Sequence, residues 1–492
     1  MSFLMQAPPP SVSPQIIASN PEISCFVMAS AGTGKTKMLI DRLLRLLFKG
    51  YSFSSILCLT FTKAAAEEMK QRLMDRASLL LNMDDQELET YFISLNIENS
   101  NQSKAIAKTL FFNLLNEQHA LKIQTIHSFC QNILEANAWV LSFIPPFSIL
   151  EEVDQKKRIL KSLEHVSQDQ AFKDAFNFLT SRMSLSQFLN YLYDAISLDE
   201  KMLQKAMEPL SYLTQKKSID LKPLLEQLPP DLLDNLLENN SSLESVFLTK
   251  EGTARKKIFK KDLLKKYEVL EDLSQTIATH FEELFDQKKQ QHLEALNFAF
   301  FNIAKAVKNN YQRTKIEHSI LDFDDLIRLT NDIFKTSSFP EIEQRLGYKI
   351  KSILVDEAQD TSPLQWEIIS ELIQNMLLCD EKNEASLLIV GDIKQAIYSF
   401  QGADPHLFLK KQDDFKKLFN HHQKSFEMLS LETSYRCLDR VLTSVDHYFN
   451  TYSSGLYLND KPLKHTPFRK GKSLVTVFDI DEGEGEENHS NA

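Results

Sequence analysis

The stretch that decides the fold is Ala29-Ser30-Ala31-Gly32-Thr33-Gly34-Lys35-Thr36. An apolar run, Ile23–Met28, precedes it, and Lys37–Phe48 behind it repeats leucine and isoleucine at helical spacing. A glycine-containing loop between a buried strand and a helix is typical of a phosphate site, because loop N–H groups and the helix N-terminus attract anions. The stretch predicts a Walker A loop, although Ala29 stands where the general pattern has glycine. All its residues are candidate nucleotide ligands; Lys35 would hold the β- and γ-phosphates of ATP, and Thr36 would ligate Mg²⁺.

Three further apolar runs have the composition of buried strands. They are Ile56–Phe61, Ile350–Val355 and Ser386–Val390. Strands that are buried on both faces have continuous apolar sequence, which is typical of parallel sheets covered by helices on each side. We therefore predict an α/β fold in which these runs and Ile23–Met28 share one parallel sheet.

Polar residues follow two of these runs where the strands should end. Asp356 and Glu357 come directly after Ile350–Val355, and Gln395 lies in the turn after Ser386–Val390. Because the carboxyl ends of parallel strands meet at one edge of a sheet, these side chains are expected beside the Walker A loop. Asp356 is the candidate Mg²⁺ ligand, and Glu357 is the candidate acceptor of a proton from the attacking water. Gln395 is a candidate sensor of the γ-phosphate.

A long stretch between the two sets of strands, Glu151–Ser319, has a different character. It is rich in leucine, lysine and glutamate and nearly free of glycine, which predicts a run of amphipathic helices. Sheet sequence on both sides of it indicates an all-helical domain inserted into the α/β domain. The basic residues clustered within 255–266 favour a solvated helix face, with contact to a DNA backbone as the alternative.

Composition limits the class of protein but does not identify it. The chain has 492 residues, of which 43% are apolar and 25% charged, as in soluble globular proteins of several domains. No apolar run is long enough to span a membrane, and the five scattered cysteines form no CxxC pair. We therefore expect a cytoplasmic protein with no membrane partner. The net charge of −11 excludes a uniformly basic surface but leaves room for a basic groove.

Seven motifs, taken in order, resemble those of the UvrD/Rep superfamily of DNA helicases, and within it the AddA family of bacterial helicase–nuclease proteins. They are Ala29–Thr36, Leu59–Met69 (LTFTKAAAEEM), Thr125–Cys130 (TIHSFC), Asp322–Leu326 (DFDDL), Val355–Asp360 (VDEAQD), Val390–Pro405 (VGDIKQAIYSFQGADP) and Leu431–Cys437 (LETSYRC). The resemblance implies two RecA-like domains, each with a helical insertion, that flank an ATP site and hold single-stranded DNA. It also implies ATP and Mg²⁺ as cofactors, and 3′–5′ movement in recombination and double-strand-break repair.

The resemblance further implies roles that spacing does not give. Gln15 matches a glutamine that reads adenine, with an ordinary exposed residue near the terminus as the alternative. Arg436 matches an arginine that reaches the γ-phosphate across the domain cleft, with a structural ion pair as the alternative. The positions that match the track for single-stranded DNA are Thr60, Phe61, Thr62, His127, Tyr398 and Phe400. Aromatic rings suit such a track because base stacking tolerates any sequence, although Phe61 suits a strand core equally well.

The motifs set the expected division into domains. Residues 1–150 and 320–420 would form the two halves of the first RecA-like motor domain, and residues 151–319 the helical insertion. Residues 421–478 would be the truncated start of a second RecA-like domain, and residues 479–492 a disordered acidic tail. The later motifs of a second motor domain and a nuclease signature are absent after residue 440. We therefore expect a split or truncated motor that works with a chain supplying the missing domains and with an AddB-like nuclease subunit.

Two functions from different classes remain open on the sequence. The first is an ATP-dependent DNA helicase or translocase, or its N-terminal portion, which the motor motifs up to Arg436 favour. The second is an ATP- and DNA-binding subunit with little helicase activity of its own, which the missing second domain favours. A P-loop kinase or GTPase fits poorly, because it explains neither the motif containing Tyr398 and Phe400 nor the helical insertion.

Overall fold

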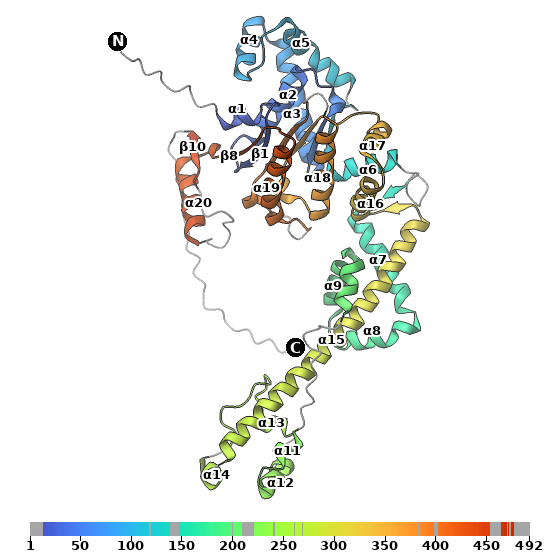
Figure 1. Ribbon diagram of the computed structural model, residues 1–492, viewed down its shortest axis with the longest axis vertical. Coiled ribbons are helices and arrows are strands. Elements are labelled where there is room, and N and C mark those ends of the chain that lie inside the picture. The colour runs from blue at the N-terminus through green and yellow to red at the C-terminus, as the bar shows by residue number, and fades with distance from the viewer. Residues whose placement is uncertain are drawn as a thin grey trace, which may run out of the picture. The chain divides into compact units, whose positions relative to one another are not determined.

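Figure 1 shows the computed structural model of the chain. The structure describes residues 13–117, 120–137, 147–198, 200–208, 221–239, 242–259, 261–267, 269–380, 384–397, 402–452, 464–469, 471 and 474–476. The chain divides into two compact units, one made of Met1–Pro146 with Phe323–Ala492 and the other of Phe147–Asp322. The expected acidic tail, 479–492, lies outside the described residues, as do Tyr398 and Phe400.

The first unit is built on a six-stranded parallel sheet with the strand order β3-β2-β6-β7-β1-β8. Its strands are β1 (Ser24–Ala29), β2 (Ile56–Thr60), β3 (Lys122–Thr125), β6 (Ser352–Val355), β7 (Ser386–Gly391) and β8 (Phe426–Leu431). All four apolar runs predicted to share a sheet are in it, and this prediction is confirmed. Together with the inserted helices, the sheet confirms the predicted RecA-like α/β class.

One domain boundary needs correction. Residues from 421 onward were expected to open a second RecA-like domain, but β8 pairs in parallel with β1 along its whole length, from Ser24 with Phe426 to Ala29 with Leu431. The first sheet therefore extends to Leu431. The physical reason is that β8 supplies hydrogen-bond partners to β1, which would otherwise be an edge strand beside the Walker A loop.

Helices cover both faces of this sheet, as the alternation of side chains requires. Cys25, Val27 and Ala29 of β1 face a core shared with the helix that follows the Walker A loop. Phe26 points to the opposite face, where its ring lies 4.9 Å from that of Phe408. The helices of this unit are α1 (Pro14–Ala18), α2 (Lys35–Phe48), α3 (Lys63–Asn82), α4 (Asp85–Ser94), α5 (Asn101–Asn116), α6 (Ile126–Ala136), α16 (Phe323–Thr336), α17 (Phe339–Leu346), α18 (Pro363–Leu378), α19 (Pro405–His421) and α20 (Asp439–Tyr452).

Two short strands follow β8. β9 (Thr433–Leu438) begins after a single intervening residue, and it pairs in parallel with β10 (Thr466–Arg469). They form a separate two-stranded sheet. The LETSYRC motif therefore runs from the end of one sheet into the beginning of another.

The second unit is almost entirely helical. Its helices are α7 (Glu152–Ser167), α8 (Lys173–Thr180), α9 (Leu185–Ser197), α10 (Glu200–Met207), α11 (Lys222–Leu225), α12 (Pro230–Asn239), α13 (Glu244–Phe247), α14 (Lys261–Lys266) and α15 (Leu270–Glu317). The 48-residue α15, the long yellow-green helix in Figure 1, contributes to two apolar cores, one near Phe281 and one near Phe300. The chain enters through β4 (Ser148–Ile149) and leaves through β5 (Ile320–Leu321), and these two strands pair with each other.

Candidate nucleotide-binding site

The Walker A loop joins β1 to α2, and Gly32 is its most constrained position. Gly32 has a φ of 78°, a conformation that costs little only for glycine. Its carbonyl accepts a 2.7 Å hydrogen bond from the N–H of Tyr435. A Cβ atom at this position would lie 2.6 Å from the Cβ of Arg436. Glycine is thus required here both by the backbone conformation and by the close approach of β9.

The geometry of a phosphate loop depends on the helix that follows it. α2 begins at Lys35, so its free N–H groups and partial positive charge face the loop. Within the loop, the Thr33 hydroxyl donates to the Ser30 carbonyl at 2.7 Å and holds the turn closed. Thr36 lies in the first turn of α2. The loop therefore offers the donors that a nucleotide phosphate needs, and the predicted ligands Ala29 to Thr36 are contiguous on it.

Lys35 and Glu357 form an ion pair that joins the loop to the end of β6. The ammonium nitrogen of Lys35 lies 3.1 and 3.3 Å from the carboxylate oxygens of Glu357. The two residues are 322 positions apart in sequence, and the strand order brings them together. Glu357 has a φ of 50°, a left-handed conformation that is uncommon for a residue with a side chain. Such strained positions cluster at functional sites.

Asp356 ends β6 beside this pair. Its N–H donates to the Leu59 carbonyl at 2.9 Å, and its carboxylate accepts the N–H of Glu357 at 2.9 Å. Burial, and then the charge of Glu357, raise the pKa of Asp356 to about 6, while Lys35 opposes the shift. A cation would reverse this cost by balancing the buried charge.

The donor set fits Mg²⁺. Asp356 and the Thr36 hydroxyl are oxygen ligands, and Mg²⁺ in nucleotide sites commonly has one or two protein ligands besides the phosphates. Within the described ranges no group of three or more His, Cys, Asp or Glu could hold a metal ion by itself. A site completed by phosphate oxygens is the arrangement these residues suit.

Gln395 lies in a turn after β7, held by Asp392. The Gln395 amide donates to the Asp392 carboxylate at 2.6 Å, and Lys394 from the same turn donates to the Ser30 hydroxyl at 2.7 Å. The structure therefore brings this turn to the Walker A loop. Gln395 faces Asp392 rather than Glu357, so its predicted sensing role would require its amide to turn.

A cavity of about 520 Å³ adjoins the Walker A loop. Its lining comes from the N-terminal segment, the start of α2, the end of α4 and β9: Ser13, Gln15, Ile16, Ser19, Thr33, Gly34, Lys37, Met38, Asp41, Ser94, Leu95 and Tyr435. Gln15 was predicted as a nucleotide ligand, and Tyr435 was not singled out. Because Tyr435 precedes Arg436 in the LETSYRC motif, its place in the sequence could have suggested it.

A buried arginine fixes the wall of this cavity that carries Gln15. Arg42 of α2 is fully buried and donates to the carbonyls of Ala18, Asn20 and Ile23 at 2.8 to 3.0 Å. It also donates to the Ser386 hydroxyl of β7 at 2.6 Å. The segment after α1 is thereby tied to the sheet. Sequence reasoning missed Arg42, because an arginine on a helix is ordinarily exposed.

Arg436 lies on β9 with its backbone against the Walker A loop. Its side chain is exposed, and its neighbour Ser434 is buried. Among the described strands, β9 pairs only with β10. The structure thus places Arg436 next to Gly32, the region where a γ-phosphate ligand is needed, without fixing its guanidinium there.

The predicted DNA-binding residues that are described follow two neighbouring strands. Thr60 pairs with Thr125 across β2 and β3, so Thr60–Thr62 and His127 share one edge of the sheet. Thr60 is buried and donates to the Thr62 carbonyl at 3.1 Å, while the Thr62 hydroxyl caps α3. Both threonines therefore have structural tasks besides any contact with DNA.

Two rings flank the same edge. His127 packs edge-on against Phe323 with ring centroids 5.0 Å apart, and burial lowers its pKa, which favours the neutral ring. Phe61 is half-buried. The structure therefore brings Thr60, Phe61, Thr62 and His127 to one edge, and the roles assigned to them remain predictions.

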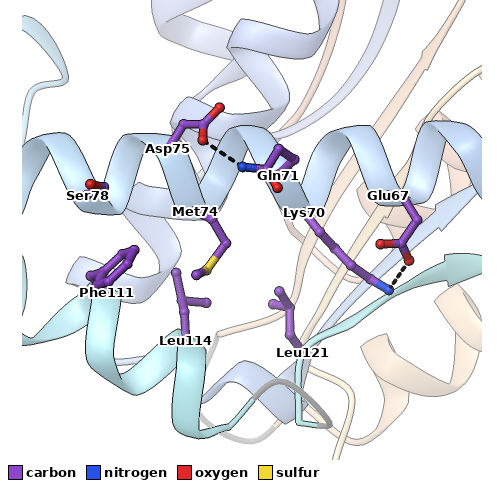
Figure 2. Close-up of a pocket in the computed structure, with 9 residues that line it drawn as sticks. All are labelled: Glu67, Lys70, Gln71, Met74, Asp75, Ser78, Phe111, Leu114 and Leu121. Carbon is purple, nitrogen blue, oxygen red and sulfur yellow. Dashed lines mark hydrogen bonds and ion pairs between the residues drawn. The ribbon is translucent and has the colours of Figure 1, made fainter.

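A larger cavity of about 650 Å³ lies elsewhere, between α3 and α5, and Figure 2 shows its lining. Lys70 and Glu67 form an ion pair at one end, and Gln71 donates to Asp75 along the helix. Met74 and Leu114 face each other across the middle. None of the predicted site residues lines it. Its size therefore does not make it the nucleotide site.

The fold and the site together define a P-loop nucleotide-binding protein: a parallel sheet, a Walker A loop after its first strand, and an acidic pair at the end of β6. Residues 12–416 match the UvrD/REP helicase N-terminal domain, and the chain belongs to this family.

Similar proteins include two that are named as ATP-dependent helicase/nuclease subunits of the AddA kind. That of Lactobacillus helveticus (strain DPC 4571) is 26% identical over 506 residues, which cover 87% of this chain and 39% of that protein. That of Clostridium perfringens (strain 13 / Type A) is 25% identical over 505 residues, covering 87% and 37%. The chain thus spans about two fifths of the length of these relatives. In the part of the chain that the structure describes, no helix is both long and apolar enough to cross a membrane.

Proposed function

We propose that this chain is the N-terminal motor portion of an ATP-dependent DNA helicase or translocase. The observation that carries the proposal is the contact between Lys35 of the Walker A loop and Glu357 at the end of β6, 3.1 Å apart in a partly shielded site. A P-loop lysine beside an acidic pair is the arrangement that NTP hydrolysis needs. The family supports DNA as the substrate that the motor moves along.

Each residue of the site has a proposed task. Lys35 holds the β- and γ-phosphates, and Glu357 accepts a proton from the attacking water. Mg²⁺, held by Thr36 and Asp356, would balance the charge of the phosphates. Arg436 stabilises the charge that develops on the transferred phosphoryl group.

The remaining parts of the site position the nucleotide and report on it. Gln15 and Tyr435 line the cavity beside the loop and are proposed to bind the adenine, the first by hydrogen bonds and the second by ring stacking. Gln395 is proposed to sense the γ-phosphate once its amide turns from Asp392.

DNA and partner proteins complete the proposal. Bases would stack in a track that includes Phe61, His127, Tyr398 and Phe400, with Thr60 and Thr62 beside it. We further propose 3′–5′ movement, a role in recombination and double-strand-break repair in the cytoplasm, and a complex with an AddB-like nuclease subunit. The remaining motor and nuclease domains, on another chain or segment, would complete the enzyme.

We propose the domain division in the same terms. Residues 1–150 and 320 to Leu431 would form the first motor domain, residues 151–319 its helical insertion, and the residues from β9 onward the beginning of a second motor domain.

A second candidate function is an ATP- and DNA-binding subunit with little turnover of its own. The observation in its favour is that β9, which carries Arg436, has β10 as its single partner strand among the described residues. An arginine on so small a sheet is weakly held.

One experiment tests both candidates. ATP hydrolysis by the 492-residue chain is measured with and without single-stranded DNA, beside the Lys35→Ala variant as the control. A DNA-stimulated rate that the control lacks supports the motor. ATP and DNA binding without stimulated hydrolysis supports the second candidate, and no ATP binding at all rejects both.

A further inference from the structure

Gln359, which the proposed chemistry does not use, lies at the centre of the acidic cluster. Its side chain is buried, with only 1% of the residue exposed. Its amide nitrogen donates to the Glu357 carboxylate at 2.9 Å and to the Asp360 carboxylate at 3.1 Å. Its amide oxygen accepts the N–H of Asp392 at 2.9 Å. One side chain thus joins the end of β6 to the turn after β7.

The turn after β7 is packed so closely that this contact is enforced. A Cβ atom at Gly391 would lie 2.9 Å from the amide oxygen of Gln359 and 2.7 Å from the ring of Phe408. Gly391 therefore lets the Gln359 amide reach the neighbouring N–H. From there the carboxylate of Asp392 continues the chain of contacts to the amide of Gln395.

We propose that Gln359 is a positioning residue, which holds the Glu357 carboxylate and couples it to the Asp392–Gln395 turn. This inference rests on the proposed function, in which Glu357 is the proton acceptor and Gln395 the γ-phosphate sensor. Through Gln359 a displacement of the sensor turn reaches the acceptor directly. The coupling makes the orientation of Glu357 depend on what the turn contacts.

Only an amide can make this set of contacts, since it offers two donors and an acceptor without charge. The charged groups around Glu357 are Lys35, Asp356 and Asp360. A charged side chain at 359 would either repel the carboxylates or compete with Lys35 for Glu357. The neutral amide orients Glu357 while leaving its charge to Lys35.

The first test compares Gln359→Met with Gln365→Met. Methionine has nearly the volume of glutamine but lacks its hydrogen bonds, and Gln365 is a buried glutamine of the same segment that caps α18 without touching the acidic cluster. Single-turnover hydrolysis should fall roughly 10–100-fold in Gln359→Met while ATP affinity stays within about twofold. The acidic limb of its pH–rate profile should move to higher pH, because a donor to the ionised Glu357 is lost. Equal effects of the two variants, on rate and on pH profile, would reduce Gln359 to a structural role.

The second test does not require turnover. The Asp392 N–H loses its acceptor in Gln359→Met, so hydrogen exchange in a peptide covering 391–397 should be faster than in the unsubstituted chain. Gln359→Glu keeps an acceptor for this N–H and should keep slow exchange. When protonated it also donates to Glu357, so its hydrolysis should approach the normal rate as the pH is lowered and fall behind as the pH is raised.

These readouts separate the positioning role from the proposed function. A chain that hydrolyses no ATP would refute the proposed function, while the exchange of the 391–397 peptide would still decide the contact made by Gln359. Should Gln359→Met not fold, Gln359→Glu alone decides by its pH profile. Unchanged exchange in a folded Gln359→Met, or a Gln359→Glu profile parallel to that of the unsubstituted chain, would overturn the inference.

Discussion

Replacing Glu357 with glutamine should separate nucleotide binding from hydrolysis. The Lys35 ammonium lies 3.1 Å from the Glu357 carboxylate, so Lys35 has to leave this partner before it can hold phosphates. The two side chains are 12% and 34% exposed, and a pair so placed contributes about 1 kcal/mol. Because the variant has no such pair to break, it should bind ATP up to roughly fivefold more tightly.

Hydrolysis should change in the opposite direction. Glutamine keeps the size of Glu357 but cannot accept a proton from water, and the loss of a general base lowers rates by roughly 10²–10⁴-fold. Lys35→Ala is the matched control, since it removes the other half of the same ion pair. It should abolish turnover and weaken ATP binding as well, because the cation that holds the phosphates is gone.

Two measurements decide the matter. Fluorescence anisotropy with a labelled ATP analogue and Mg²⁺ gives the affinity, and single-turnover phosphate release gives the rate. Thermal unfolding of both variants shows whether they are folded. If Glu357→Gln lost ATP binding as completely as Lys35→Ala, the division of roles between the two residues would be wrong.

Three further outcomes are expected. Tyr398→Ala and Phe400→Ala should each weaken binding to single-stranded DNA by about 1–3 kcal/mol whatever its sequence, and unchanged affinity in a folded variant would assign these rings to the core. Because the pKa of Asp356 is raised to about 6, its carboxylate takes up a proton as the pH falls through 6; Mg²⁺-dependent ATP binding should weaken roughly tenfold per pH unit below that value, and titrations from pH 5 to 8 would show it. The 492-residue chain alone should bind ATP and Mg²⁺ but hydrolyse slowly and fail to unwind duplex DNA, because Arg436 is weakly held; adding a fragment with the second motor domain should restore turnover, and robust unwinding by the chain alone would refute this.

The interior of the sheet was predictable, but its edges were not. β1, β2, β6 and β7 lie between other strands and are apolar almost throughout, so their sequences stand out. β3 and β8 are the edge strands, and several of their residues reach solvent. A strand that is exposed on one side has no continuous apolar run, and this is why β8 was assigned to the following domain.

The site shows the same division between contiguous and distant contacts. Lys35, Asp356 and Glu357 follow strands directly, so the convergence of strand ends predicted where they meet. Gln359 was passed over because its role depends on the N–H of Asp392, a partner that only the packing of β7 beside β6 supplies. Tyr435 reaches the cavity through the contact of β9 with Gly32, which no local pattern encodes.

The pairing of β4 with β5 has a consequence for how this protein can vary. Ser148 lies beside Ile320 and Ile149 beside Leu321, so the chain enters and leaves the helical unit through parallel neighbours. Neighbouring strands are only about 4.8 Å apart, so a chain that ran from 147 directly into β5 would need no more than a sideways step of that size. Whatever lies between the two strands can lengthen, shrink or be exchanged with little added cost of closing the loop. Insertions and deletions that distinguish related genes should therefore accumulate between residues 150 and 319, where an ancestral motor could acquire a new DNA-handling module while its six-stranded sheet stayed unchanged.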